Sequence, residues 1–390
     1  MIRRPPRSTQ SRSSAASDVY KRQGISIVNS TNIYLVRCIV SNNTISAANM
    51  YSYGGGIYAD NSYGVISNCW IGRNRMQGIV ANYYLYGAGI HLNAGSWVIR
   101  DSVIFYNTSR SAGNPGYAFG GGLSVINGTH TVKNCLFVQN YCWGYVDDNA
   151  IYTRGDGIFH SAGTLTIENC TIAGNKGEGV RGIATTTLRD CILWRNGRDV
   201  TNSAVVATVN CLIGNGERAG INGNISANPL FELGFYLATN SPAIDAGSRT
   251  VSEAGLTGKT TLTNGVADTG TVDLGYHYPG VHPLPDLYVS TTGTDANAGT
   301  NWVTLRTVKK AISKADLGTR IHIAAGKYDA AGGETFPVIV DVAGLLIKGT
   351  NRSTTVIHAP GSPTQIRAMW LKDLSFGTIE GLKIQNGYYN

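Results

Sequence analysis

Asn134-Cys135-Leu136-Phe137-Val138-Gln139-Asn140 is the stretch that decides the fold, because its pattern recurs along residues 37 to 215. In each copy a Cys, or once a Ser, has an apolar residue two positions later, and most copies have Asn or Asp just before it and Asn five positions after it. Successive copies are 31, 33, 33, 35, 21 and 20 residues apart, which is typical of a repeat with one supersecondary unit per copy. We name these positions the cysteine column: Cys38, Cys69, Ser102, Cys135, Cys170, Cys191 and Cys211.

Two further strands lie at a constant offset from the column. Twelve residues before four column positions stands an apolar residue that follows glycines, as in Gly120-Gly121-Gly122-Leu123. Another apolar residue, such as Val132, stands three residues before the column, and the Asn or Asp between them predicts a turn with positive φ. Because side chains alternate along a strand, the column residue and the apolar residue two positions later point inward together.

Three short strands per coil predict an all-β chain folded as a parallel β-helix. The crossover rule for parallel strands makes this β-helix right-handed. A leucine-rich repeat is the structural alternative, but it needs several Leu at fixed offsets, and these coils carry Gly, Ile, Cys and Asn instead.

The composition suits such a solenoid. The chain has 390 residues with 49 Gly and only 14% charged residues, which is typical of many short strands joined by tight turns. It has no run of about 18 apolar residues, so no membrane-spanning segment is expected. Residues 1–23 contain six Lys or Arg and one Asp, which accounts for +5 of the net charge of +8, and they resemble a translated sequencing adapter. We therefore expect a non-native, disordered leader and no nucleic-acid partner, the alternative being a basic arm that binds nucleic acid.

The seven Cys predict buried free thiols rather than disulfides or a zinc site. The chain contains no CxxC pair, and six of the seven Cys share one phase of the repeat. Stacked, parallel side chains would have to twist to reach the dihedral angle of a disulfide, whereas thiols pack well as small apolar groups. Cys142 lies off the column, and we expect it to be the one exposed or reactive thiol.

The coils of residues 24–230 resemble the pectin-lyase-like superfamily of right-handed β-helices. Residues 231–285 contain Ser241-Pro242-Ala243-Ile244-Asp245-Ala246-Gly247, which resembles the choice-of-anchor Q domain that ends many bacterial surface β-helix proteins. The match is looser at Gly275-Tyr276-His277-Tyr278. The resemblance implies a closing module and a secreted or cell-surface location.

Residues 286–390 resemble the opening of bacterial β-helix domains of unknown function. A short amphipathic helix is predicted from Leu305 to Ala315, followed by a strand from Arg320 to Ala324. Such a helix would cap the first coil, because an open coil end would template aggregation. The opening of one β-helix domain after the closing module of another predicts a piece of a longer tandem protein. A misassembled gene is the alternative.

Enzymes of the superfamily that these coils resemble cleave acidic polysaccharides, as lyases with carboxylate-held calcium or as hydrolases with paired Asp. The hydrolase motifs are absent as a set, and only Asp147-Asp148 matches one of them. These two carboxylates are candidate calcium ligands, and no other cofactor is expected. Stacked coils would bring further polar residues near them. The catalytic candidates are Asp147, Asp148, Asp156, His160, Lys176 and Arg181.

A stronger signal is aromatic. The segments between each trailing Asn and the next glycines are rich in Tyr, and because they share one phase of the coils, we expect them to stack into one row. Aromatic surfaces with polar rims suit sugars and protein ligands alike, whereas the alternative is that these rings only pack their own loops. The predicted ligand-binding residues are Tyr84, Tyr86, Tyr117, Phe119, Tyr141, Trp143, Tyr145 and Tyr152.

Two functions follow as hypotheses. The first is a noncatalytic, adhesin-like or glycan-binding β-helix whose partner is a polysaccharide, a cell-surface glycan or the surface of a host or neighbouring cell. The second is a polysaccharide lyase or glycoside hydrolase acting on acidic polysaccharide. The missing hydrolase motifs and the anchor-associated resemblance favour the first, since a fold by itself implies no activity.

Overall fold

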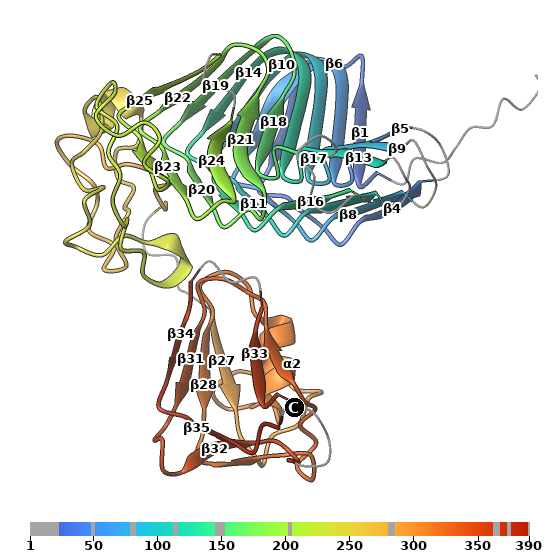
Figure 1. Ribbon diagram of the computed structural model, residues 1–390, viewed down its shortest axis with the longest axis vertical. Coiled ribbons are helices and arrows are strands. Elements are labelled where there is room, and N and C mark those ends of the chain that lie inside the picture. The colour runs from blue at the N-terminus through green and yellow to red at the C-terminus, as the bar shows by residue number, and fades with distance from the viewer. Residues whose placement is uncertain are drawn as a thin grey trace, which may run out of the picture.

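The computed structural model describes most of the chain and contains two β-solenoid units joined by a closing module (Figure 1). Its parallel strands confirm the predicted parallel β-helix. Within the described residues no helix is long and apolar enough to cross a membrane. The described ranges are 23–47, 51–78, 83–111, 116–144, 153–201, 205–279, 285–361, 367–372 and 376–388.

Two parallel sheets, A and B, form the coils of the first unit. Sheet A has eleven strands and provides two of the three strands of each coil, which are fused into single 11-residue strands in β6, β10 and β14. Sheet B has seven strands and carries the residues just after the column. Sheet A comprises β1 (Ile25–Val28), β2 (Ile33–Val36), β6 (Ile57–Ser67), β10 (Ile90–Arg100), β14 (Leu123–Lys133), β18 (Ile158–His160), β19 (Thr164–Glu168), β21 (Glu178–Gly182), β22 (Thr186–Arg189), β24 (Arg198–Thr201) and β25 (Val206–Val209). Sheet B comprises β3 (Ile39–Ser41), β7 (Trp70–Gly72), β11 (Val103–Phe105), β15 (Leu136–Val138), β20 (Thr171–Ala173), β23 (Ile192–Trp194) and β26 (Leu212–Ile213).

The turn between the two sheets has the predicted conformation. The Asn or Asp before six column positions has a φ between 46° and 54°, in the left-handed region that these side chains tolerate. We name them the turn residues: Asn68, Asp101, Asn134, Asn169, Asp190 and Asn210.

The cysteine column lies inside the solenoid, as predicted. Cys69, Cys135 and Cys170 are completely buried among the aliphatic side chains of sheets A and B. Burial raises the pKa of the Cys170 thiol. These contacts confirm a column of free, packed thiols.

The column also forms hydrogen bonds that the sequence did not suggest. The N–H of Cys69 donates to Ser102 Oγ over 3.0 Å, and the N–H of Cys135 donates to Cys170 Sγ over 3.3 Å. Cys170 Sγ in turn donates to the carbonyl of Glu168 over 3.2 Å. A thiol or hydroxyl at this position therefore satisfies a buried main-chain N–H of the preceding coil.

These bonds predict that serine is tolerated in the column better than valine. Cys170→Ser keeps an acceptor for the N–H of Cys135, whereas Cys170→Val leaves it unpaired at a cost of about 2 kcal/mol. We expect urea unfolding to place Cys170→Ser above Cys170→Val in stability. Equal stability, or a more stable valine variant, would show that the thiol is only an apolar filler.

The trailing Asn residues form a second buried ladder beside the column. Asn107 Oδ1 accepts from the main-chain N and the Nδ2 of Asn74 over 3.1 and 2.9 Å. Asn107 Nδ2 donates to the carbonyl of Ile71 over 2.9 Å and to Asn140 Oδ1 over 3.0 Å. The ladder ends where Asp199 Oδ1 accepts from Asn196 Nδ2 over 2.9 Å. We name its members the asparagine ladder: Asn43, Asn74, Asn107, Asn140, Asn175 and Asn196.

Segments that we expected to be loops form two more parallel sheets, C and D, which extend sideways from the longer coils (Figure 1). They are strands because alternate side chains, including Met76, Leu85 and Ala118, pack between the two sheets in a small core of their own. We name this feature the lateral extension. Sheet C comprises β4 (Thr44–Ala47), β8 (Arg75–Gly78), β12 (Thr108–Ser111) and β16 (Tyr141–Trp143). Sheet D comprises β5 (Tyr51–Tyr53), β9 (Tyr83–Tyr86), β13 (Gly116–Phe119) and β17 (Thr153–Arg154).

The lateral extension buries Cys142, so the prediction that this thiol is exposed is wrong. Cys142 is 2% exposed and belongs to the core between sheets C and D. Desolvation in that core raises the pKa of its thiol, which disfavours the reactive thiolate.

The closing module runs along the turn residues. Most of it is irregular, with a 3-10 helix (Leu233–Phe235) and α1 (Val251–Ala254). Asn134 Nδ2 donates to the carbonyl of His277 over 2.9 Å, and its Oδ1 accepts from the His277 N–H over 2.7 Å. Asp190 Oδ1 accepts from the Ser248 N–H over 2.7 Å, and Arg249 pairs with the same carboxylate. The turn residues thus also serve as docking points.

The second unit begins at β27 and contains the expected helix. α2 spans Val308–Lys314, three residues shorter at its start than predicted, because Thr307 caps it by accepting from the Lys310 N–H and Leu305 bridges to Val289 instead. Its buried residues pack on the core of the unit, as its periodicity predicted. The strands are β27 (Asp286–Val289), β28 (Arg320–Ile323), β29 (Gly326–Tyr328), β30 (Val338–Val340), β31 (Leu346–Gly349), β32 (Thr355–His358), β33 (Met369–Leu371), β34 (Thr378–Glu380) and β35 (Lys383–Gln385).

The second unit packs on the outer face of sheet B. Phe105 and Leu136 of sheet B share a hydrophobic cluster with Leu317 and Ala343 of the second unit. In the middle coils the outward side chains of sheet B meet this unit, and in the later coils Ile192 and Leu212 meet Leu237 of the closing module, so these coils are buried on both faces. Ile39, on the first strand of the sheet, is 78% exposed.

Candidate ligand-binding surface

The outer face of sheet D carries two rows of aromatic rings. Tyr51, Tyr84 and Tyr117 are register partners on neighbouring strands, and their ring centroids are 5.1 and 4.4 Å apart. The second row passes through Tyr53, Tyr86 and Phe119 with centroids 5.5 and 4.9 Å apart, and it continues to Phe159. We name these two rows the aromatic ladder. The predicted stacking of successive coils therefore holds for Tyr84, Tyr86, Tyr117 and Phe119.

The rings stack on one another, so the ladder offers edges and hydroxyls rather than open faces. The planes of Tyr84 and Tyr117 are inclined by only 6°, which means that each covers a face of the other. Partial burial and a hydrogen bond with Tyr117 raise the pKa of Tyr84 above its ordinary value. Partial burial raises the pKa of Tyr86 to about 12, so these hydroxyls stay protonated at neutral pH. The ladder can thus donate hydrogen bonds and contact C–H groups along its edges.

The ladder meets the outer face of sheet A at a corner, which we name the aromatic corner. Tyr58 and His91 are neighbours on β6 and β10, and their rings stack with centroids 5.6 Å apart. The ring of Tyr53 reaches across the corner to within 4.9 Å of His91. Asn93 Nδ2 and Asp60 Oδ1, 2.9 Å apart, add polar groups to the same outer face. His91 is only 1% exposed beneath these rings, whereas Tyr58 is partly exposed. The sequence contains no signal for this contact, since both residues stand singly in their strands.

Tyr141 and Trp143 belong to a different surface from the aromatic ladder. They lie on β16 of sheet C, where their register partners are Thr108 and Arg110. The Arg110 guanidinium lies 4.7 Å from the Trp143 ring centroid. The predicted single row therefore divides between the two sheets of the lateral extension. Tyr145 and Tyr152 lie outside the described residues.

Three of the catalytic candidates are engaged in structural contacts. Asp156 is 2% exposed, and its Oδ2 accepts from the Gly177 N–H over 2.8 Å. Arg181 donates to Glu178 Oε1 over 2.6 Å. The ring nitrogens of His160 are 2.8 Å from Thr186 Oγ1 and from the carbonyl of Ala162, and burial lowers the pKa of this imidazole.

The other candidates give no calcium or catalytic geometry in the described residues. Lys176 Nζ lies 4.6 Å from the ring centroid of Tyr141 and 3.3 Å from its hydroxyl, at sheet C. Asp147 and Asp148 lie outside the described residues, so their roles as calcium ligands or acids stay predictions.

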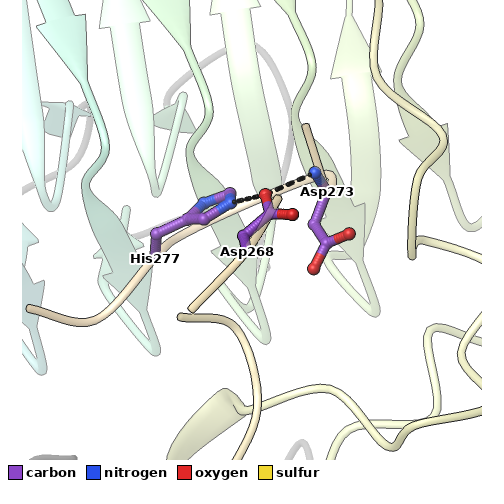
Figure 2. Close-up of side chains that lie close together, drawn as sticks. All are labelled: Asp268, Asp273 and His277. Atoms are coloured by element: carbon purple, nitrogen blue, oxygen red, sulfur yellow. Dashed lines mark hydrogen bonds and ion pairs between the residues drawn. The ribbon is translucent and has the colours of Figure 1, made fainter. Parts of the chain in front are cut away.

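Asp268, Asp273 and His277 in the closing module come close together (Figure 2), with one ligand atom of each within 4.8 Å of the others. Asp268 Oδ2 accepts from the Asp273 N–H and is 2.9 Å from His277 Nε2. Asp273 Oδ1 accepts from the Asp245 N–H over 2.8 Å, and Thr261 donates to Oδ2. The cluster is thus a hydrogen-bonded network that holds the turns of the closing module.

Its coils and parallel sheets define this chain as a parallel β-helix protein. A family described as "Protein of unknown function (DUF1565)" matches residues 291–387, within the second unit. No curated protein gives a significant match. The solved structures include a match to a mutant of AlyGC, an alginate lyase of the PL6 family, with 10% identity and a TM-score of 0.20, over 92% of this chain and 68% of that chain.

Proposed function

We propose that this protein is a noncatalytic, secreted or cell-surface β-helix protein that binds glycans along the aromatic corner in an adhesin-like role. The observation that carries the proposal is the periodic row of hydroxyls and ring edges of Tyr51, Tyr84 and Tyr117. Neighbouring coils rise by about 4.8 Å, close to the length of one sugar residue. A polymer of similar repeat would therefore meet equivalent groups at each coil.

The walls of the corner also fit a glycan. Tyr53 and Tyr58 supply apolar edges for sugar C–H groups, while Asn93 and Asp60 supply amide and carboxylate oxygens for sugar hydroxyls. The structural contacts of Asp156, His160 and Arg181 favour binding over hydrolysis or lyase chemistry at these residues.

Loss of rings from the row of Tyr51, Tyr84 and Tyr117 is expected to weaken glycan binding. Tyr84→Ala together with Tyr117→Ala removes two rings and two hydroxyls, which we expect to reduce retention on a glycan array by about tenfold or more. Tyr84→Phe with Tyr117→Phe keeps the edges and should bind at an intermediate level. Tyr63→Ala, an exposed tyrosine outside the ladder, is the matched control.

Two results would overturn the proposal. The first is undiminished retention by the folded double alanine variant, with folding checked by circular dichroism. The second is release of products from pectate or alginate by the wild-type protein, which would make the chain an enzyme.

A further inference from the structure

A groove lies between the lateral extension and the second unit, on the sheet C side and apart from the aromatic corner. It consists of two cavities of about 430 and 440 Å³ that share Tyr106 and Asp341 in their walls. One side comes from coils of the first unit, including Thr108 and Tyr141, and the other from α2 and the loops after β30 and β33.

The walls of this groove are strongly basic. Among the described residues that line it, five are Lys or Arg and one, Asp341, is acidic. Four of the five basic side chains are exposed, and the fifth, Arg73, is 34% exposed. The basic residues are Arg73, Lys176, Arg195, Lys309 and Lys372.

The contacts of these side chains leave positive charge in the groove. Arg73 pairs with Asp316 over 3.3 Å, at the edge of the second unit. Lys309 Nζ donates to Thr335 Oγ1 over 2.7 Å, and Lys176 Nζ lies against the Tyr141 ring. Hydroxyl and aromatic partners hold a cation in position without neutralising it.

The two walls are held together by hydrogen bonds, so the groove exists before a ligand arrives. The Ala343 N–H of the second unit donates to the Tyr106 hydroxyl over 2.6 Å and to Gln139 Oε1 over 3.1 Å. Arg73 also donates to the carbonyl of Ala315 over 2.9 Å. A preformed site reduces the entropy that binding must offset.

We propose that this groove binds a polyanionic glycan, one that carries carboxylate or sulfate groups, and the proposal rests on the glycan binding proposed above. The basic side chains on both walls would pair with the anionic groups. Tyr141 and Thr108 offer an aromatic ring and a hydroxyl to the sugar itself. This mixture of rings and neutral polar groups favours a glycan over an acidic peptide.

The test measures binding of oligogalacturonate and heparin oligosaccharides to the full chain, with a maltooligosaccharide as uncharged control and polyglutamate as an acidic peptide. We expect one of the anionic glycans to bind with an affinity that falls as salt is added. Lys176→Ala together with Arg195→Ala should weaken that binding by about tenfold or more. Lys348→Ala together with Arg352→Ala removes the same charge from residues outside the groove and should leave binding unchanged.

The outcomes separate this proposal from the proposed function. If glycans bind, and their binding is weakened in the Tyr84 and Tyr117 variant but not in the Lys176 and Arg195 variant, the groove proposal fails and the proposed function stands. Equal losses in the two charge variants would show nonspecific attraction, and tighter binding of polyglutamate would assign the groove to an acidic peptide, so both overturn the proposal. If no glycan of any charge binds, the proposed function fails as well.

Discussion

Asn107→Ala is expected to lower the free energy of unfolding by about 4 kcal/mol, because it removes several buried hydrogen bonds and leaves a main-chain N–H without its acceptor. The side chain of Asn107 bonds to groups in the coils on both sides and is completely buried. Its loss would leave the Asn74 N–H without its acceptor. It would also remove one hydrogen bond each from Asn74 Nδ2, the carbonyl of Ile71 and Asn140 Oδ1. Urea unfolding followed by circular dichroism measures the change.

Asn43→Ala is the matched control for this prediction. Asn43 stands at the start of the asparagine ladder, is only partly buried, and donates one side-chain hydrogen bond, to Asn74 Oδ1 over 2.8 Å. Its loss should cost only about 1 kcal/mol. Similar costs for the two substitutions would show that the continuous ladder does not stabilise the coils.

Gly89→Ala is expected to destabilise the first unit by about 3 kcal/mol or more, because a methyl group has no space between stacked coils. Its Cβ would lie 2.5 Å from the carbonyl oxygen of Gly122 and 2.9 Å from Asn107 Nδ2. Neither neighbour is a flexible side-chain end, since one is main chain and the other is fixed in the asparagine ladder. Relief would require two coils to separate.

Gly377→Ala provides the comparison for this substitution. A Cβ at Gly377 would come no closer than 3.5 Å to its nearest neighbour, the carbonyl oxygen of Leu345, which is an ordinary contact. We expect its unfolding midpoint in urea to stay close to that of the wild-type protein. A Gly89→Ala variant as stable as Gly377→Ala would mean that the coils are not held at this spacing.

The coils could be predicted because the same residue types recur at the inward and turn positions of each repeat. Cys135, Phe137 and Asn134 each occur at a fixed phase, and stacking adds the same environment in every coil. The glycines before the sheet A strands were equally visible in the sequence, but the physical reason for glycine at these positions was not. It lies in the closeness of Gly89 to Gly122 in the next coil.

The lateral extension could not be predicted in the same way. Its strands are only two to four residues long, and Thr108-Ser109-Arg110-Ser111 buries small polar residues, so the apolar alternation that marks a strand is missing. The contacts of the closing module were equally hidden, since Asn134 and His277 are far apart in sequence. Nothing local signals such a pair.

The candidate site was predicted in part. Equal phase placed Tyr84 and Tyr117 together, because register follows from the repeat. The position in the repeat could not show that the rings of Tyr84 and Tyr117 would stack face to face. It also could not show that Tyr141 would lie on sheet C instead of sheet D. The groove needed the position of the second unit, which depends on contacts such as Ala343 with Tyr106.

The closing module has a mechanical consequence for the first unit. A bare solenoid can fray one rung at a time, because each repeat touches only its neighbours. Here the closing module binds several coils at once, because Lys259, His277 and Ser248 contact Asp101, Asn134 and Asp190 on different coils. Rungs tied in this way must open together, so pulling on the protein should meet one large rupture rather than a series of small slips.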